Sequence, residues 1–241
     1  MLPLFFVPEI GSSPEIEVSG DEARHAIKVV RLEVGEGVQL SDGVSRWIDG
    51  RITEVKKNSF VVTVESRHEH DSVVPELIVV QALMKSDRAK EAIELLTVAG
   101  VDRIIPWQAE RSIAKWQHDL GEKWLATSQV AAKQSRRPIL PAIEDLQSTA
   151  VIGKRFAQSA HMIILHEEAT TQLSALAHEL RSDKHGVIVL VIGPEGGISP
   201  QEIELFQSHG GVVTRLGDQV LRSAHAGFAS LAAVQALLGR W

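Results

Sequence analysis

Residues 189–202 read VLVIGPEGGISPQE and join an unbroken apolar run to a glycine-rich turn and then to a helix start. Ser199, Pro200 and Glu202 form a capping-box pattern, in which Ser199 is the N-cap and Glu202 follows three residues later. The GPEGG turn therefore connects a buried strand to a helix. Glycines at such a place let the backbone approach a ligand closely, although an ordinary tight turn with a solvated Glu195 has the same composition.

Four further apolar runs occur in the same part of the chain. With the run VIVLVI at 187–192, the five runs include LIVVQAL at 77–83, RIIPW at 103–107, MIILH at 162–166 and VVTRL at 212–216. Helical patterns fill most of the intervals between them. The first has Ser86 as N-cap, Ala89, Ile93 and Leu96 on one face, and Gly100 as its stop, and the last runs from Ala224 to Leu238. This alternation predicts an α/β domain with a parallel sheet covered by helices on both faces.

Three of these strands end in polar or glycine-bearing turns. The run at 162–166 leads into Glu167, the run at 187–192 leads into GPEGG, and the run at 212–216 leads into GDQVLRS, which ends at Ser223. If the three strands are neighbours, their ends converge on one pocket. A phosphate-binding P-loop is excluded because no Lys-Ser/Thr pair follows the glycines, and GPEGG lacks the G-x-G-x-x-G spacing of a dinucleotide site.

The N-terminal residues up to position 72 have a different sequence pattern. Short alternating segments at 38–40, 46–55 and 60–65, separated by turn residues, predict a small antiparallel barrel or sheet, interrupted by a helical insert at 21–30. The polar stretch RHEHDSVVP at 67–75 predicts a domain boundary, which gives domains 1–72 and 73–241. We interpret the histidines of RHEH as part of this linker and expect no metal site.

Composition limits the class of protein. The chain has 241 residues, 44% of them hydrophobic and 23% charged, and no cysteine, so thiolate chemistry and disulfides are excluded. No apolar run approaches the ~18 residues of a membrane span, and we expect a cytoplasmic protein that needs no membrane. The net charge of −6 argues against promiscuous nucleic-acid binding. Residues 81–140 nevertheless hold ten Lys/Arg against seven Asp/Glu, so a polyanion would meet a local patch.

Several motifs, taken in order along the chain, carry a family resemblance. They are the segment His25–Arg31, Lys85 with Asp87-Arg88, QSRRPILP at 134–141, GPEGGIS with Glu202, and LGDQVLR at 216–222. The sequence resembles the RsmE-like family of the SPOUT class, which methylates uridine N3 in 16S ribosomal RNA of the small subunit. The resemblance implies an N-terminal PUA-like β-barrel that binds RNA and a C-terminal SPOUT α/β domain with a trefoil knot. It also implies a homodimer that binds S-adenosyl-L-methionine in the knot.

The resemblance also implies roles for individual residues. The three strand-end turns would hold the cofactor with Leu165, His166, Glu167, Ile192, Gly193, Pro194, Gly196, Gly197, Leu216, Gly217, Val220, Leu221 and Ser223. Arg222 is the candidate for contacting the uracil or stabilising its anion, with a structural salt bridge as the alternative. Glu195 could order the loop, attract the sulfonium or accept the N3 proton, in that order of preference.

Basic residues spread along the chain could form the phosphate footprint of an RNA. The candidates are His25, Lys28, Arg31, Lys85, Arg88, Arg111, Lys133, Arg136 and Arg137. Each of them taken singly is more often a solvated surface charge.

The sequence departs from the family pattern at two acidic positions. Where the family has Thr-Glu-Thr-Ala after the arginine, this chain has Ser223, Ala224, His225 and Ala226, and Val98 replaces a glutamate near the end of the first helix. An enzyme that needed an acid at position 224 would therefore be inactive or use another group. This leaves open a non-catalytic RNA-binding or assembly factor. A hydrolase that uses Ser223 and His225 is disfavoured, because residues two apart in a helix do not share a face.

Overall fold

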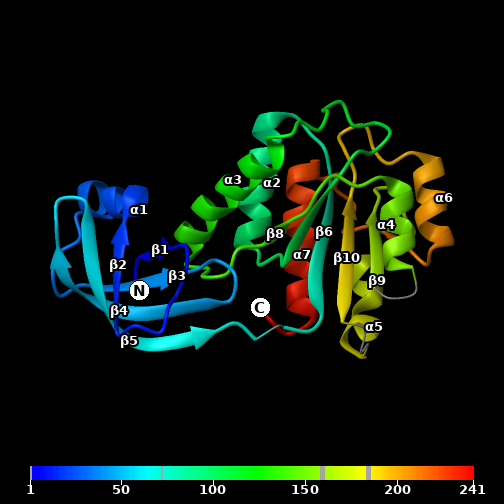
Figure 1. Cartoon of the computed structure of the whole chain (residues 1–241). Coiled ribbons are helices and arrows are strands. Elements are labelled where there is room, and N and C mark those ends of the chain that lie inside the picture. Colours follow the sequence, from blue (N-terminus) through cyan, green and yellow to red (C-terminus); the bar gives the residue numbers. More distant parts are fainter. Residues whose placement is uncertain (1, 72, 158–160, 183–185) are drawn as a thin grey trace. The chain divides into compact units, whose positions relative to one another are not determined.

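The computed structural model describes residues 2–71, 73–157, 161–182 and 186–241. Its backbone divides into two compact units, and Figure 1 shows their elements coloured along the chain. The first unit contains residues 1–72 together with 132–140, and the second contains residues 73–131 and 141–241.

The first unit is built on a five-stranded mixed sheet. Its strands are β1 (Leu4–Phe6), β2 (Glu15–Ser19), β3 (Gly37–Ser41), β4 (Arg46–Val55) and β5 (Ser59–Glu69), in the order β1-β3-β4-β5-β2. The prediction of a purely antiparallel sheet is wrong at one edge, because β1 pairs with β3 in parallel. The interpretation of RHEH as linker is also wrong in part, since β5 continues through His68 to Glu69 and pairs there with β4.

Alternating residues of these strands form the core of the first unit. Val38, Leu40, Ile48, Phe60 and Val62 are fully buried, as the period-two pattern requires. The predicted helical insert is confirmed, as α1 (Gly20–His25) followed by the π-helix η1 (Ala26–Val30).

The second unit contains a six-stranded sheet in which every neighbouring pair is parallel. The strands are β6 (Glu76–Ala82), β7 (Arg103–Trp107), β8 (Ala142–Ile143), β9 (His161–Leu165), β10 (Val187–Ile192) and β11 (Val212–Thr214), in the order β11-β9-β10-β6-β7-β8. All five predicted strands are present. The sequence did not indicate β8, which is only two residues long.

Helices cover both faces of this sheet, as predicted. They are α2 (Ser86–Val98), α3 (Leu120–Ser135), α4 (Thr149–Phe156), the 3-10 helix η2 (Leu173–Leu176), α5 (Ala177–Ser182), α6 (Pro200–Ser208) and α7 (Ser223–Leu237). Helix α2 has Lys85 as its N-cap, one residue before the predicted position, and Gly100 follows its end with a φ of +85°.

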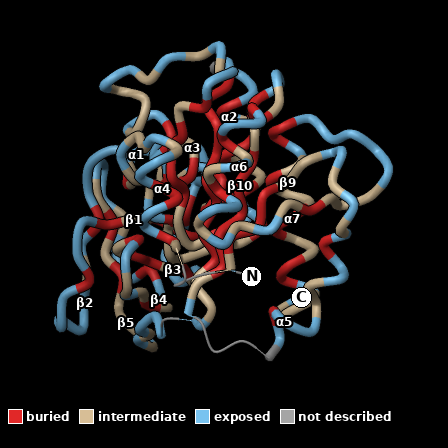
Figure 2. Tube along the Cα trace, turned by 90° about the vertical axis from the view of Figure 1, so that its right-hand side faces the viewer, coloured by how far each residue is buried: buried red, intermediate tan, exposed pale blue. Residues whose placement is uncertain are grey.

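Successive residues of β6 face the two helical layers in turn. Leu77 and Val79 pack in the core formed with α2, α5 and α7, whereas Ile78 and Val80 pack in the core formed with α4 and α6. Figure 1 shows α2 and α7 on one side of β6 and β10 and α4 and α6 on the other, and the colouring of Figure 2 shows that β10 is buried. The trefoil knot concerns how the chain threads past the turns after β9 and β10, and it stays a prediction.

Candidate functional site

The predicted pocket lies at the carboxyl ends of β9, β10 and β11. It has a volume of about 290 Å³, close to the lower end of the range for small-molecule sites. Strand pairing brings the three ends together, since β9 lies between β10 and β11 and the amide of His166 donates to the Thr214 carbonyl at 2.9 Å. The lining residues are Leu165, His166, Glu167, Ile192, Gly193, Pro194, Glu195, Gly197, Ile198, Arg215, Leu216, Gly217, Gln219, Val220, Leu221, Arg222, Ser223 and Ala226.

This lining contains every residue expected to hold the cofactor except Gly196, and it contains both Glu195 and Arg222. Gly196 lies instead against a neighbouring loop, where a Cβ would be 3.1 Å from the Cβ of Arg111. Sequence reasoning missed Ile198, Arg215, Gln219 and Ala226. A usable signal existed for Arg215. This residue directly follows Thr214, the last residue of β11, and so lies at the strand end where the pocket is expected.

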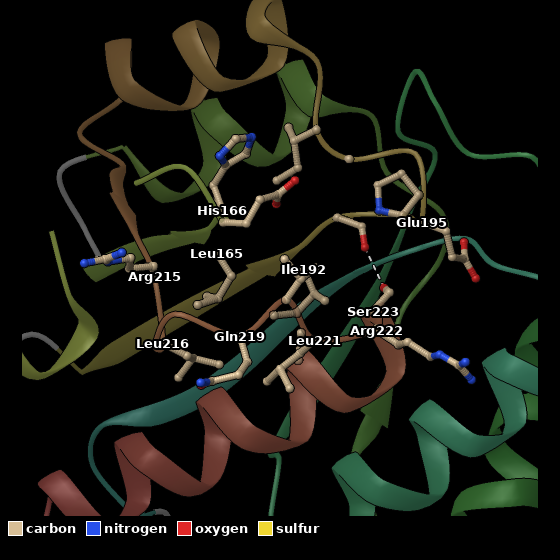
Figure 3. Close-up of a pocket in the computed structure, with 18 residues that line it drawn as sticks. Leu165, His166, Ile192, Glu195, Arg215, Leu216, Gln219, Leu221, Arg222 and Ser223 are labelled. Carbon is tan, nitrogen blue, oxygen red and sulfur yellow. Dashed lines mark hydrogen bonds between the residues drawn. The ribbon is translucent and has the colours of Figure 1, made fainter. Parts of the chain in front are cut away.

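The middle of the pocket is apolar and its ends are polar. Figure 3 shows Leu165, Ile192, Leu216 and Leu221 in the central part of the pocket, with His166 and Arg215 toward one end. Arg215 is held by an ion pair with Asp218 at 3.2 Å. An apolar slot with polar ends suits a ligand that combines a flat ring with charged groups.

Glu195 and Arg222 extend at the opposite end of the pocket from Arg215 (Figure 3). Both side chains are exposed, and among the residues that the structure describes neither has a hydrogen-bond or ion-pair partner. The salt-bridge alternative for Arg222 therefore finds no partner in the described chain. The carboxylate of Glu195 likewise makes no hydrogen bond among the described residues, so the first of its three expected roles, ordering its own loop, has no hydrogen bond behind it.

Other groups order the GPEGG turn. The predicted capping box is present: the Ser199 hydroxyl accepts from the Glu202 amide at 3.4 Å, and the Glu202 carboxylate accepts from the Ser199 amide at 3.2 Å. Gly197 has a φ of +75°, where an L side chain is strained, and its amide donates to the Pro194 carbonyl at 2.9 Å. The turn is therefore held by its own backbone and by the start of α6.

The Glu202 side chain also joins this turn to the loop after β7. Its second oxygen accepts from the Glu110 amide and from the Thr149 hydroxyl, each at 3.0 Å. The Thr149 oxygen in turn accepts from the Trp107 indole at 3.0 Å. In the same loop, the Arg111 guanidinium donates to the Gly196 carbonyl at 3.2 Å. One buried carboxylate thus fixes two loops and the first turn of α4.

Ser223 closes the pocket from the side of α7. Its hydroxyl donates to the Gly193 carbonyl at 2.5 Å, the contact drawn in Figure 3, and lies 3.2 Å from the Gln81 amide nitrogen. His225 points elsewhere, since its Nε2 pairs with Glu91 at 3.0 Å. The geometry therefore gives no serine–histidine pair for a hydrolase.

Position 224 does not face the pocket. Ala224 is 2% exposed and packs in the hydrophobic core with Leu96 and Leu231. The absence of an acid there removes no side chain from the pocket lining.

The predicted RNA-binding cations differ in their surroundings. Within the first unit, Lys133 pairs with Glu22 and lies 5.9 Å from the Phe6 ring centroid. In the second unit, Arg88 pairs with Glu91 at 2.7 Å, and Arg111 holds the Gly196 carbonyl. Exposed cations without a partner in the described chain are His25, Lys28, Arg31, Lys85 and Arg136, and Arg137 is half-buried.

Two features are absent from the part of the chain that the structure describes. There, no three His, Asp or Glu side chains are grouped so that they could hold a metal ion. None of the helices in the same ranges is both long and apolar enough to span a membrane.

Comparisons with known proteins cover almost the whole chain. Residues 71–235 match the RNA methyltransferase domain family, and residues 18–65 match the RNA methyltransferase PUA domain family. A ribosomal RNA small subunit methyltransferase E from Mycobacterium bovis is 38% identical over 247 aligned residues, which cover 99% of this chain and 93% of the relative. The protein of the same name from Bacillus subtilis is 27% identical, with coverage of 94% and 91%.

Solved structures share the fold. The ribosomal RNA small subunit methyltransferase E from Neisseria gonorrhoeae, bound to S-adenosyl methionine, superposes with a TM-score of 0.85 at 24% identity, over 98% of both chains. A Legionella pneumophila protein in complex with the cofactor SAM gives a TM-score of 0.84 at 26% identity, also over 98% of both chains. The fold is therefore a PUA-like mixed sheet followed by a parallel α/β domain. On the match to both domains and the identity to the M. bovis protein, the chain belongs to the ribosomal RNA small subunit methyltransferase E family of RNA methyltransferases.

Proposed function

We propose that this protein transfers a methyl group from S-adenosyl-L-methionine to N3 of a uridine in 16S ribosomal RNA of the small subunit. The observation that carries the proposal is the pocket at the ends of β9, β10 and β11, in which Arg222 extends without a partner among the described residues. The family relationship supports the reaction class. The choice of N3 of uridine rests on the motif resemblance.

The chemistry of the pocket fits S-adenosyl-L-methionine. Leu165, Ile192, Leu216 and Leu221 offer an apolar slot for an adenine ring, and glycine-rich turns leave backbone groups free to approach it. Glu195 supplies negative charge for a cationic ligand. When bound, the cofactor supplies an electrophilic methyl group.

The protein's own residues would then act on the uracil. The N3 proton must leave before N3 can attack, and the negative charge that develops spreads over the uracil carbonyl oxygens. A guanidinium presents several N–H donors in one plane and stays protonated, so Arg222 can stabilise that charge. Its position directly before α7 places it at the rim of the pocket, where RNA can reach it.

Glu195 has two remaining roles in this proposal. Because its carboxylate orders no described backbone amide, we assign it first to electrostatic attraction of the cationic cofactor and second to accepting the N3 proton. The two roles differ in which binding and rate constants change when the charge is removed.

RNA binding would rest on exposed cations in each unit. In the first unit these are His25, Lys28, Arg31 and Arg136, and in the second unit Lys85 is exposed close to the first turn of α2. Phosphate contacts of this kind give affinity without sequence information and weaken as salt rises. Along the sequence we keep domains 1–72 and 73–241, with the first as the RNA-binding domain and the second as the knotted catalytic domain. Residues 132–140, which include Arg136, belong to the first unit in space.

The homodimer is proposed on an apolar groove between α2 and α7. The groove has a volume of about 580 Å³, is lined by Leu95, Val98, Leu221, Phe228 and Ala229, and carries Glu91, Glu94 and His225 at its polar positions. Val98 is 48% exposed, and Leu221 lines this groove and the cofactor pocket. A second copy seated here would remove apolar surface from water. Light scattering should report a dimer-sized mass, and an active monomer would contradict the assignment.

The proposed reaction is tested by product analysis. Purified protein would be incubated with methyl-labelled S-adenosyl-L-methionine and small ribosomal subunits from cells that lack the enzyme, and the RNA would be digested to nucleosides. Label in 3-methyluridine is the expected result. Label in another nucleoside would contradict the proposed position. Cofactor binding without transfer would point to a different substrate or to chemistry lost with the acid at position 224, and no cofactor binding at all would favour an RNA-binding factor.

A further inference from the structure

Gln81 is a polar residue in the middle of the hydrophobic core. It is the sixth residue of β6, lies between Val80 and Ala82, and is 1% exposed. A buried side-chain amide lowers stability unless it is hydrogen-bonded, so a glutamine at this place calls for a partner. The partner is a residue of the pocket.

The direction of the hydrogen bonds follows from their geometry. The single hydroxyl hydrogen of Ser223 is directed at the Gly193 carbonyl, 2.5 Å away, so the Ser223 oxygen can only accept from Gln81. The Gln81 nitrogen lies 3.2 Å from that oxygen and 3.3 Å from the Ala82 carbonyl. Its amide oxygen is buried without a partner in the described chain. The amide orientation is therefore fixed by the serine and not by packing alone.

These bonds join three parts of the site in series. Gln81 belongs to the central strand β6, Ser223 is the first residue of α7, and Gly193 begins the turn after β10. Arg222, the N-cap of α7, immediately precedes Ser223 and makes no side-chain capping bond of its own. The link from Gln81 through Ser223 is thus a direct constraint on the backbone that carries Arg222.

Close packing of α7 reinforces this link. A Cβ added at Gly227 would lie 3.4 Å from the Gln81 amide oxygen and 3.2 Å from Leu96. The first turns of α7 therefore lie close to β6 and α2, and a side chain at position 227 would push them apart. The Gln81 amide therefore lies against the first turns of α7.

We propose that Gln81 is a positioning residue, which acts through Ser223 to hold Arg222 in the orientation required for methyl transfer. The inference rests on the proposed function and goes beyond it, because Gln81 does not line the pocket. It predicts that changing Gln81 alters the rate of transfer more than the affinity for cofactor.

The chain offers a matched control in Gln235. This second buried glutamine lies near the other end of α7, is 5% exposed, donates to the Ala99 carbonyl at 3.0 Å and also has an unpartnered amide oxygen in the described chain. Gln81→Met and Gln235→Met remove the same groups at similar volume. We expect Gln81→Met to lower kcat by about tenfold or more, since small misplacements of a reacting group have effects of this size. The cofactor Kd of Gln81→Met, measured by calorimetry, should stay within about threefold of the value for the unaltered protein. The kcat of Gln235→Met should stay within the same factor of the unaltered rate.

Two further variants separate positioning from general stability. If Gln81 acts through Ser223, the double variant Gln81→Met with Ser223→Ala should be no slower than Ser223→Ala alone. Gln81→Glu keeps the side-chain size and adds a pH signature. Burial raises the pKa of the introduced carboxyl, whose neutral form can donate to Ser223 and whose ionised form cannot. The rate of Gln81→Glu relative to the unaltered protein should fall as pH rises.

The outcomes distinguish this inference from the proposed function. No transfer by the unaltered protein would overturn both. Transfer by the unaltered protein, with Gln81→Met equal to Gln235→Met or with effects that multiply in the double variant, would overturn only the role of Gln81. If Gln81→Met does not fold, Gln81→Glu still provides a test. A ratio of its rate to that of the unaltered protein that does not change with pH would overturn the positioning role of Gln81.

Discussion

The Glu202 carboxylate accepts a hydrogen bond from the Thr149 hydroxyl at 3.0 Å, and through the same oxygen it accepts the amide of Glu110. Its other oxygen caps α6 through the Ser199 amide. A residue that the sequence identifies as half of a capping box therefore also fastens the turn after β10 to the loop after β7.

Glu202→Gln should lower the free energy of unfolding by about 1–3 kcal/mol, because one acceptor oxygen becomes an N–H group that faces a buried amide donor. Urea denaturation measures this change. Glu204→Gln, at an exposed position of the same helix, is the control and should leave the stability nearly unchanged. Equal effects of the two variants would show that the buried network contributes no stability.

Gly197→Ala should weaken cofactor binding in addition to lowering stability. Gly197 and Gly210 have φ angles of +75° and +89°, so alanine at either position introduces strain of about 1 kcal/mol. Only Gly197 lines the pocket. Calorimetric titration with S-adenosyl-L-methionine should therefore show reduced affinity for Gly197→Ala and unchanged affinity for Gly210→Ala, with similar losses of thermal stability. If the two variants bind the cofactor equally well, the conformation of the turn at Gly197 does not contribute to cofactor binding.

Glu195→Gln separates the two roles assigned to this carboxylate. If the charge attracts the cationic cofactor, the variant should bind S-adenosyl-L-methionine roughly fivefold more weakly, while affinity for the uncharged thioether S-adenosylhomocysteine stays constant. If the carboxylate accepts the N3 proton, both affinities stay constant and the single-turnover rate falls. A variant that matches the unaltered protein in all three measurements would exclude both roles.

Stability should depend on pH through Glu144. Hydrogen bonds from Arg155 and then Arg103 hold the pKa of this carboxyl below its usual value of 4.5, against the opposing effect of burial. A lowered folded-state pKa adds stability above pH 4.5, and this contribution is lost as pH falls through the folded pKa. Glu144→Gln should therefore be less stable than the unaltered protein at pH 7, and the difference should shrink under acid. A difference that is constant from pH 7 to pH 3 would contradict this assignment.

Much of the second unit could be predicted because its signals are local. Parallel strands buried on both faces appear as continuous apolar runs, and the start of α6 is encoded by Ser199, Pro200 and Glu202. The rule that ligands bind at this edge of a parallel sheet predicts a pocket at the strand ends. The sequence leaves open whether the three strands are neighbours, and the sheet order β11-β9-β10 shows that they are. The first unit was harder, since the parallel pairing of β1 with β3 depends on contacts between segments far apart in the chain.

Features of the site that depend on side-chain direction could not be predicted. The sequence shows an acid missing at Ala224 but not that this position faces the core. It places Gly196 beside the other glycines but does not show that Arg111 packs against it. Gln81 lies within an apolar run, and its hydrogen bond to Ser223 spans 142 residues of sequence. These properties arise from tertiary packing, which no local pattern records.

Single-turnover methyl transfer by Arg222→Ala, with cofactor affinity measured in parallel, tests most directly whether Arg222 stabilises the charge on the uracil. Arg222 lines the pocket and its side chain has no hydrogen-bond or ion-pair partner among the described residues, so the fold and the cofactor Kd should be preserved. The rate of 3-methyluridine formation should fall by about 100-fold or more, as expected when a charge-stabilising donor is removed. Lys154→Ala, at an exposed position of α4, should retain the full rate. An Arg222→Ala variant that binds cofactor and methylates at the rate of the unaltered protein would show that Arg222 does not stabilise the charge on the uracil.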